Sequence, residues 1–540
     1  MRFVKHILSC LLSVLLFFIS WPPNSLPGFI FVALVPIIWL VFNFDQQKRR
    51  FAAWSLFGYL FFTFFCINFS LTSWLMNAHW GGGLFASIFN ASLMSLVFVL
   101  VYKLKKQMGD KHAYLAFSII WLAFEYLHLN WEMTWPWMSL GNVFAEQTSW
   151  IQWYEYTGVL GGSLWVLLIN SLIYYSLSRI IGRRTVIKSI VFVLAFLFIP
   201  LWKSNQLVSD FDVNSGEQVN VVIVQPNYEP HFEKFKVPQQ LQLQRVEGLL
   251  DTVWQTNPDL IVLPETFITD WIWESRIESS PVIERMKLWL NENPETQILT
   301  GASTGRVLND VENFKSTARR SQGGTWYEVF NTALLISADK PTQIFHKSKL
   351  VPGAEMTPFS SILKPFFENF PIELGGTIGN FGVNDSIFNL RTHQGDIASM
   401  ICYESVFGAY VSEFVNKGAD WICIITNDGW WKETYGHQQH NAYARLRAIE
   451  NRRFVVRSAN TGISSVINPQ GRVEQFLLYG ESGIIEASII KSSKLSFYSR
   501  YGDYIGRLAS FLAIIYLLQL VLTYLKNDKI DLKSLKNENL

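Results

Sequence analysis

The stretch Ile397-Ala-Ser-Met-Ile401-Cys402-Tyr403-Glu404 runs from apolar, strand-like residues to a thiol and then at once to polar side chains. A buried strand that delivers a cysteine to the edge of a sheet can present a nucleophile. Two other strand-like runs also end on a single charged residue: Glu265 follows Leu260-Ile-Val-Leu-Pro264, and Lys347 follows Thr342-Gln-Ile-Phe-His346. A base, a cation and a thiol are the parts that covalent acyl transfer needs.

A purely structural interpretation of Cys402 stays open at this point. Free cysteine is among the most buried residue types, so a thiol in an apolar run is often only a packing residue. Cys423, within Trp421-Ile-Cys-Ile-Ile425, fits that interpretation, and so do Cys10 and Cys66 in long apolar segments. Four cysteines in 540 residues, two of them in such segments, predict no disulfide framework.

The composition favours a membrane protein. Half of the residues are hydrophobic, and the chain has 42 Phe and 21 Trp. This is too apolar for a soluble protein of 540 residues. The net charge of +2 does not suggest a nucleic-acid partner, so none is expected.

Eight segments have the length and the lack of charge that membrane-spanning helices need. They are residues 7–22, 28–44, 52–75, 84–102, 114–130, 159–178, 186–202 and 508–525. The third is the most clearly apolar, with no charged residue from Phe51 to Met76. Pro36 interrupts the second, which membrane helices tolerate.

The basic residues cluster between these segments on one side. They precede the first span, follow the eighth, and lie between spans two and three, four and five, and six and seven: Arg2, Lys5, Lys48, Arg49, Arg50, Lys103, Lys105, Lys106, Arg179, Arg183, Arg184, Lys526, Lys529 and Lys533. The positive-inside rule then places both termini in the cytoplasm. The polar block between spans seven and eight is therefore expected outside, which in a bacterium with two membranes is the periplasm.

Three domains follow from this topology. We expect a seven-span transmembrane domain at residues 1–204, a periplasmic domain at 205–500, and a C-terminal transmembrane helix with a cytoplasmic tail at 501–540. The outer block of about 290 residues is long enough to bury one full core.

Inside the outer block, β-rich apolar runs alternate with polar helical stretches. The strand candidates are Val219–Val224, Leu260–Leu263, Gln297–Thr300, Ala333–Ser337, Ile397–Ile401, Asp420–Ile425, Phe454–Arg457 and Ser464–Ile467. The helix candidates are Gln239–Thr256, Pro281–Asn293 and Gln438–Asn451. This alternation predicts an α/β fold with helices packed on sheets.

Three segments of the outer block carry a family resemblance. They are Leu263-Pro-Glu-Thr266, Lys347-Ser-Lys-Leu-Val-Pro352 with Glu355 beyond it, and Ile401-Cys-Tyr-Glu404. In this order they resemble the Glu-Lys-Cys signatures of the nitrilase, or carbon–nitrogen hydrolase, superfamily. Further matches are Asn427-Asp-Gly-Trp430, the segment 444–450 and the segment 457–462. The resemblance implies an α/β domain of the nitrilase-like αββα sandwich type.

The membrane segments narrow the resemblance. Seven spans, a nitrilase-like domain and an eighth span resemble the apolipoprotein N-acyltransferase family, the membrane-embedded branch of that superfamily. The similarity covers nearly the whole chain and includes Trp135-Pro-Trp137 and Tyr498-Ser-Arg-Tyr-Gly-Asp503. The chain departs from the family at Phe235, where a Trp is frequent, and at Val351-Pro-Gly-Ala354, where an aromatic residue is expected after the proline.

The resemblance implies a chemical role for three residues. Cys402 would attack an ester and form a thioester, and Glu265 would take the thiol proton and return it to the leaving alcohol. Lys347 would stabilise the oxyanion, with the backbone N–H of Tyr403 as a second donor. From the residues alone, Glu265 could instead cap a following helix, and Lys349 has the same chemistry as Lys347. The family pattern favours Lys347, because Glu355 then falls eight residues on.

Other residues would support the reaction or bind the substrates. Glu355 would orient Lys347 or the base. Tyr403 and Glu404 flank the nucleophile and would shape the pocket. The remaining candidates for substrate binding or support are Phe235, Asn427 and Trp430.

No metal or other cofactor is expected. His437 and His440 are three residues apart, but a third ligand at a suitable spacing is missing, so we assign both to a helix start or to the surface. Glu125 is costly inside a membrane, and we assign it to substrate access or helix pairing. The Trp-rich segment 131–158 is expected to form an interfacial belt, and secondarily a lipid portal.

The topology and the resemblance together imply two substrates. A thiol facing the outer leaflet would take an acyl chain from a phospholipid, phosphatidylethanolamine or a similar donor. The acceptor would be the free α-amine of the diacylglyceryl-cysteine of an apolipoprotein, in the last step of lipoprotein maturation at the bacterial inner membrane. One pocket that serves both substrates in turn gives ping-pong kinetics.

Two other functions are compatible with parts of the sequence. A membrane-tethered nitrilase-type amidase would use the same residues to deliver the acyl group to water, but a soluble substrate needs at most one membrane anchor. A transporter whose outer domain is only a binding module predicts charged residues in several spans, whereas Glu125 is nearly alone.

Overall fold

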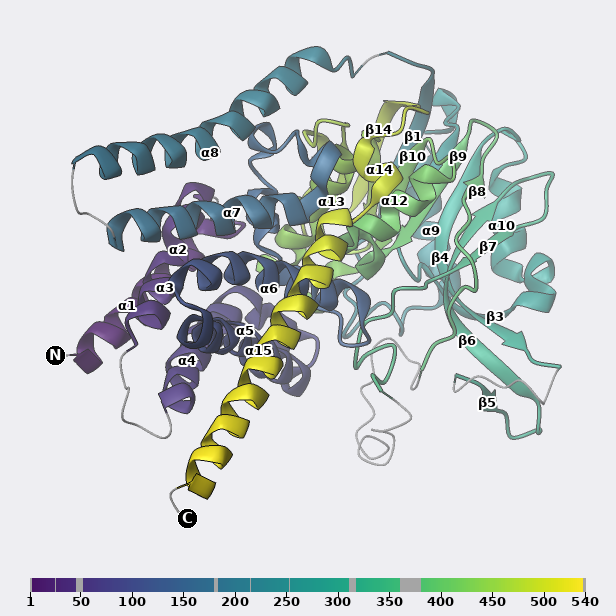
Figure 1. Ribbon diagram of the computed structural model, residues 1–540. Coiled ribbons are helices and arrows are strands. Elements are labelled where there is room, and N and C mark those ends of the chain that lie inside the picture. Colours follow the sequence, from purple (N-terminus) through teal and green to yellow (C-terminus); the bar gives the residue numbers. More distant parts are fainter. Residues whose placement is uncertain are drawn as a thin grey trace.

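The computed structural model describes residues 2–24, 26–44, 52–178, 183–213, 215–251, 253–309, 317–359 and 380–537. Figure 1 shows two parts: a group of long helices on the left and an α/β part with the strands on the right. The basic cluster Lys48-Arg49-Arg50 and Arg179, on which the topology prediction partly depends, lie outside the described residues.

The helical part contains seven long helices among the described residues. They are α1 (Arg2–Ser20), α4 (Ala52–Thr72), α5 (Trp80–Met108), α6 (Asp110–Asn130), α7 (Tyr154–Ser178), α8 (Arg183–Asp210) and α15 (Tyr504–Asn537). Between α1 and α4 lie the short helices α2 (Ile30–Ala33) and α3 (Val35–Asn43). The break between α2 and α3 is compensated by Asn170 of α7, whose side-chain oxygen accepts from Leu34 N at 2.9 Å and whose amide donates to Ile30 O at 2.9 Å.

The structure does not confirm eight spans. Within the described ranges, six helical segments are long and apolar enough to cross a membrane: Arg2–Ser20, Ala52–Asn77, Trp80–Met108, Tyr154–Ser178, Ile187–Asp210 and Tyr504–Lys526. The second predicted span forms only a shorter apolar helix over Pro27–Asn43, because prolines interrupt the chain there. The fifth predicted span is helix α6, whose hydropathy is lowered by Glu125 and His128.

Glu125 acts as a packing residue in the helical part. Its carboxylate oxygen Oε1 accepts hydrogen bonds from Trp121 Nε1 at 2.8 Å and from Leu140 N at 2.9 Å. The buried carboxylate therefore holds the segment after α6 against that helix; its assignment to substrate access or helix pairing stays a prediction.

The α/β part contains two sheets. The eight-stranded sheet has the order β14-β1-β2-β4-β6-β5, with β3 paired to β4 and β7 paired to β6. Its strands are β1 (Gln218–Gln225), β2 (Leu260–Val262), β3 (Ile268–Trp273), β4 (Gln297–Val307), β5 (Arg319–Arg320), β6 (Trp326–Ile336), β7 (Gln343–His346) and β14 (Gly483–Ile490). The six-stranded sheet has the order β13-β12-β11-β10-β9-β8. Its strands are β8 (Leu390–Arg391), β9 (Asp396–Ile401), β10 (Trp421–Thr426), β11 (Val455–Ala459), β12 (Ser464–Ile467) and β13 (Val473–Leu477).

Alternating side chains along β1 show how the layers are built. Val219, Val221 and Ile223 join the core between the two sheets, whereas Val222 and Val224 face the opposite way. The second set packs with helices α9 (Gln239–Leu250) and α10 (Pro281–Trp289). Helices α12 (Gly408–Asn416) and α13 (Tyr435–Asn451) pack on the six-stranded sheet. The predicted α/β fold, with helices outside two packed sheets, is confirmed.

Helix α13 connects the α/β part to the helical part. Its Tyr443 hydroxyl accepts from Trp21 Nε1 at 3.1 Å and donates to Trp137 O at 2.9 Å. Gln439 accepts from Trp74 Nε1 at 3.2 Å. Trp137 is buried in this contact, so at least this member of the Trp-rich segment belongs to the contact between the two parts and not to an interfacial belt.

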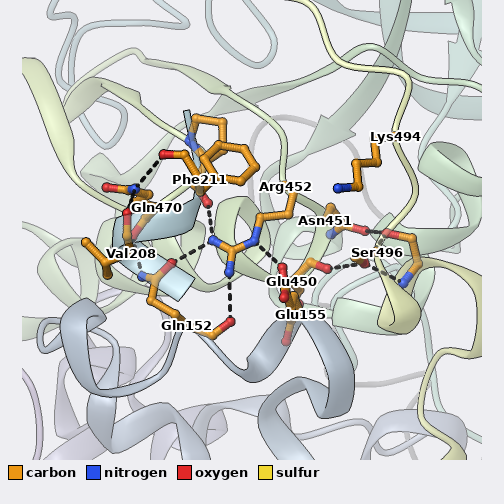
Figure 2. A network of polar contacts seen from close by, with 12 residues as sticks. Gln152, Glu155, Val208, Phe211, Glu450, Asn451, Arg452, Gln470, Lys494 and Ser496 are labelled. Carbon is orange, nitrogen blue, oxygen red and sulfur yellow. Dashed lines mark hydrogen bonds and ion pairs between the residues drawn. The ribbon is translucent and has the colours of Figure 1, made fainter. Parts of the chain in front are cut away.

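The end of α13 is fixed by Arg452 (Figure 2). The Arg452 guanidinium donates to Glu155 Oε2 at 2.5 Å, to Gln152 Oε1 at 2.6 Å and to the Gln152 carbonyl at 2.9 Å. The same network continues through Gln470, whose amide donates to Val208 O of α8 at 3.0 Å. One planar cation thus joins α13 to the segment that leads into α7.

Arg452→Met should therefore destabilise the whole protein. The substitution keeps an unbranched apolar stem but removes the guanidinium, which leaves buried oxygens of Gln152 and Pro469 without their donor, each at a cost of about 1–3 kcal/mol. The control is Arg285→Met, whose partner Glu247 lies on the surface and whose loss should cost less than about 1 kcal/mol. Thermal unfolding of the detergent-solubilised variants at one scan rate measures both, and equal shifts would contradict the role of Arg452.

Candidate active site

Cys402 lies at the turn between strand β9 and the short 3-10 helix η9 (Cys402–Val406). After Asp396 the strand is fully buried, while Cys402 itself is partly exposed. Its φ of 51° lies in the left-handed region, which costs a non-glycine residue about 1–3 kcal/mol. Cys423, in contrast, is completely buried within β10, as its structural interpretation requires.

Glu265 follows the end of β2 and precedes strand β3. Since the next element is a strand, the alternative that Glu265 caps a helix is wrong. Its Oε1 accepts from Asn331 Nδ2 at 2.8 Å and lies 3.4 Å from Lys347 Nζ. Thr266, directly after it, has a φ of 50°, so a second strained backbone position adjoins the site.

Lys347 follows β7 and is 1% exposed, which excludes a solvated loop charge. Its Nζ donates to Glu355 Oε1 at 2.8 Å. Burial alone would lower the pKa of the Lys347 ammonium, but the carboxylates of Glu355 and Glu265 raise that pKa above its ordinary value. Lys347 is therefore a permanent cation at neutral pH.

Lys349 occupies a different environment. Its Nζ lies 5.3 Å from the ring centroid of Phe407 and 5.6 Å from that of Tyr410. Burial lowers the pKa of Lys349. Of the two lysines that the sequence offered, only Lys347 contacts the carboxylates of Glu265 and Glu355.

The thiol of Cys402 is electrostatically coupled to these residues. Burial raises its pKa above the ordinary value for a cysteine, Glu265 raises it further, and Lys347 opposes the shift. The thiol is therefore protonated at neutral pH. A nearby base must take the proton as the sulfur attacks.

Two polar residues that complete this cluster were missed by the sequence analysis. Asn331 of β6 donates to Glu265 at 2.8 Å and lies 3.2 Å from Glu355 Oε1. Lys234 is buried and donates through Nζ to the Glu265 carbonyl at 2.8 Å, and burial lowers its pKa to about 7. The signal for Asn331 was a single amide inside the apolar run Val329-Phe-Asn-Thr-Ala333.

Glu404 joins the Cys402 turn to the Lys347 loop. Its Oε2 accepts from Ile401 N at 2.9 Å, and its Oε1 accepts from Ser348 N at 2.7 Å and from the Tyr410 hydroxyl at 2.8 Å. The carboxylate is fully buried, and burial raises its pKa. It therefore shapes the site by holding backbone segments of the two sheets together.

Tyr403 points toward the helical part. Its hydroxyl donates to the Thr134 carbonyl at 3.0 Å. The residue after Cys402 is thus anchored on the segment that follows α6.

Phe235 and Trp430 lie together. Their rings stack with centroids 6.1 Å apart, and Phe235 is 38% exposed. Asn427 is buried instead, and its side-chain oxygen accepts from Asn460 Nδ2 at 3.0 Å. Asn427 therefore holds the loop that carries Trp430.

His437 and His440 begin α13, but neither is on the surface. Both are buried, because one side of α13 packs on the sheet and the other on the helical part. The surface role predicted for them is wrong.

His440, Cys402 and Asp428 place three atoms that could bind a metal within 4.8 Å of one another. Arg457 Nη2, however, lies 2.6 Å from Asp428 Oδ2 and 3.0 Å from His440 Nδ1. A guanidinium at this point repels a metal cation.

Comparisons with known proteins cover the α/β part and much of the helical part. The chain matches the carbon–nitrogen hydrolase family over residues 221–493 and the apolipoprotein N-acyltransferase N-terminal domain over residues 13–172. An apolipoprotein N-acyltransferase of Chlorobaculum tepidum is 30% identical over 502 residues, which are 90% of each chain. Apolipoprotein N-acyltransferase 1 of Treponema denticola is 23% identical over 98% of each chain. That of Geobacter metallireducens is 25% identical over 72% of this chain and 70% of its own.

The two family matches together cover the α/β sandwich and the helices up to residue 172, but not α8 and α15. The relative from Chlorobaculum tepidum extends across both parts as well. The chain belongs to the apolipoprotein N-acyltransferase family, within the carbon–nitrogen hydrolase superfamily.

Proposed function

We propose that this protein transfers an acyl chain from a membrane phospholipid to the α-amine of the diacylglyceryl-cysteine of an apolipoprotein, as the last step of lipoprotein maturation. The observation that carries the proposal is the cluster in which Lys347 pairs with Glu265 and Glu355 beside the strained turn of Cys402. Family membership supports the two substrates. Phosphatidylethanolamine or a similar phospholipid is the proposed donor.

In the first half-reaction, Glu265 takes the thiol proton while Cys402 Sγ attacks the ester carbonyl of the phospholipid. A carbon–sulfur bond forms and the carbonyl oxygen becomes an oxyanion, which Lys347 and the N–H of Tyr403 stabilise. One such donor is worth about 3 kcal/mol of barrier. The carbon–oxygen bond then breaks, and the leaving alcohol of the lysophospholipid receives the proton from Glu265.

In the second half-reaction, the α-amine attacks the thioester carbonyl. Glu265 takes a proton from the amine nitrogen, the carbon–nitrogen bond forms, and the carbon–sulfur bond breaks. The proton returns to the sulfur of Cys402, so the enzyme is regenerated. Because the two substrates use one thiol in turn, the kinetics are ping-pong.

The charge of Lys347 supports its assignment to electrostatic stabilisation. Its raised pKa keeps it from donating a proton at neutral pH, so proton transfer falls to Glu265. Glu355 and Asn331 then act as positioning residues for Lys347 and Glu265.

The aromatic wall formed by Phe235 and Trp430 is the proposed contact for lipid chains. Phe235 is exposed enough to meet a substrate. It offers an apolar face but no hydrogen-bond donor, unlike the Trp that is frequent in the family at this position.

For the membrane arrangement, we propose that eight segments cross the bacterial inner membrane, including the helix over Pro27–Asn43 and helix α6. We propose three domains at residues 1–204, 205–500 and 501–540, with the second in the periplasm, although α8 continues past residue 204 to Asp210. Two observations support this. The basic residues of the sequence then lie on one side, and Figure 1 shows the N-terminus and the end of α15 pointing away from the sheets.

Cys402→Ser should abolish transfer, by about 10³-fold or more. A hydroxyl has a much higher pKa than a thiol and is poorly activated by a carboxylate alone. The assay incubates the purified enzyme with phospholipid and a diacylglyceryl peptide, and mass spectrometry detects the acylated peptide and a hydroxylamine-sensitive acyl group on the enzyme. Cys423→Ser is the matched control and should stay active. Free fatty acid without acylated peptide would identify an amidase-like hydrolase instead.

Lys347→Arg should reduce transfer by about 10²–10³-fold, although the positive charge is kept. A planar guanidinium is larger than an ammonium and holds its donors in a fixed fork, so it does not fit between Glu265 and Glu355. Lys349→Arg is the control and should lose less than about tenfold, because a guanidinium stacks well on the rings of Phe407 and Tyr410. Steady-state assays of both variants measure the loss of transfer. If only the Lys349 variant were impaired, Lys349 and not Lys347 would be the catalytic lysine.

Fusions to a reporter that is active only outside the cytoplasm should show the proposed sidedness. A fusion after Asp212 should be active and one after Asn537 inactive, since short basic loops resist translocation. A pair after Gly109 and after Gln147 tests whether α6 crosses, with activity expected only for the second. Reporter activity in the fusion after Asn537, but not in the fusion after Asp212, would contradict the proposed lipoprotein substrate, because the acceptor amine is presented outside the cytoplasm.

A further inference from the structure

The backbone carbonyl of Cys402 is held by two buried side chains. Ser405 Oγ donates to this oxygen at 2.7 Å. His440 Nε2 lies 3.2 Å from the same oxygen and 3.0 Å from Ser405 Oγ. Because a carbonyl oxygen only accepts hydrogen bonds, Nε2 of His440 carries a hydrogen. Both side chains are buried, so no water competes for the carbonyl from that side.

The other ring nitrogen of His440, Nδ1, is also held by buried side chains. Its Nδ1 lies 2.9 Å from Asp428 Oδ1 and 3.0 Å from Arg457 Nη2. A neutral ring accepts at Nδ1 from Arg457, whereas a charged ring donates there to Asp428. The neutral tautomer with its hydrogen on Nδ1 would place a lone pair of Nε2 against the Cys402 carbonyl, so the contact selects the two forms that carry a hydrogen on Nε2.

Because the peptide bond is planar, the contact that holds the Cys402 carbonyl also fixes the direction of the N–H of Tyr403. In a planar trans peptide the C=O and the N–H point in opposite directions. The carbonyl of Cys402 and the N–H of Tyr403 belong to one peptide unit. When His440 and Ser405 fix the carbonyl on the buried side, the N–H of Tyr403 is aimed at the opposite side.

The backbone at Cys402 is strained, so the peptide that follows it depends on side-chain contacts for a fixed orientation. Its φ of 51° is disfavoured for a residue with a side chain. Rotation of the peptide after Cys402 would turn the Tyr403 N–H away unless the carbonyl is held.

We infer that His440, together with Ser405, is a positioning residue that orients the Tyr403 N–H toward the oxyanion. This inference rests on the proposed function, in which that N–H is the second oxyanion donor. His440 touches neither substrate and acts only through the peptide that follows the nucleophile. Asp428 and Arg457 keep the imidazole in place.

Two reactions of the same thiol test the inference. Acylation of Cys402 by phosphatidylethanolamine in detergent micelles passes through an oxyanion, whereas alkylation by iodoacetamide forms a carbon–sulfur bond and expels iodide without one. A residue that only places or activates the thiol affects both rates. A residue that aims the oxyanion donor affects acylation alone. Mass spectrometry of the peptide that carries Cys402 measures both single-turnover rates.

His440→Phe keeps an aromatic ring next to Trp137 and Trp431 but has no N–H, and should slow acylation at least about tenfold. Its alkylation rate should change less than about threefold. His440→Gln, whose amide can reach the same carbonyl, should recover part of the acylation rate. The matched control is His437→Phe, since the ring of this buried neighbour contacts the carbonyl of Lys432 and should affect neither rate.

Ser405→Ala serves if the His440 variants do not fold, since it removes one donor to the carbonyl and little volume. A selective loss of acylation in either variant supports the inference. Equal losses in both reactions, or none in acylation, overturn it. Absence of a thioester in the unsubstituted enzyme would instead refute the proposed function, so the two failures are distinguishable.

Discussion

The buried ammonium of Lys347 is the interaction on which the rest of the site depends. Removing a charged amine from water costs several kcal/mol unless opposite charges lie beside it, and Glu265 and Glu355 both lie within ion-pair distance. Glu265 follows β2, Lys347 follows β7, and Glu355 lies in the loop after β7. The cluster therefore forms only when the strands of the eight-stranded sheet have their final register. A shifted register would leave a buried charge without a partner, and the fold and the chemistry are therefore specified by the same contacts.

The proposed nucleophile, Cys402, comes from the other sheet and must be brought to this cluster. Glu404 does so, because its carboxylate binds the backbone at Ile401 on one sheet and at Ser348 beside Lys347 on the other. A buried carboxylate that bonds to backbone N–H groups fixes positions more tightly than a contact between two flexible side chains. The strained φ of Cys402 is maintained by this bond and by the side chains that hold its carbonyl.

Much of the sandwich and the order of Glu265, Lys347 and Cys402 could be predicted, because apolar runs that end on one polar residue mark strand ends. The lengths of the strands could not be predicted. Strand β4 continues to Val307 and β6 begins at Trp326, and at these ends the residues are exposed or half-buried and the apolar pattern stops. The sequence did not reveal the roles of Asn331 and Lys234, and it led to a wrong surface role for His440. In each case the partners of the residue are distant in the sequence. Periodicity reports which face is buried but not which polar groups meet there. Only six of the eight predicted spans are long apolar helices among the described residues, and a distant partner again contributes, since Asn170 of α7 compensates the break between α2 and α3 from more than a hundred residues away.

Helix α13 shows why the least predictable residues are also the most informative. A helix that lies between a sheet and a second layer of helices is buried on both sides, so a polar residue on either side must find a specific partner. On one side His440 contacts the turn at Cys402, and on the other Gln439 and Tyr443 bind tryptophans of the helical part. These bonds are directional, unlike apolar contacts, and so they fix both the rotation and the height of the helix. The thiol is thereby set at a defined distance from the helices that carry the enzyme in the membrane, which a lipid substrate that cannot leave the bilayer requires.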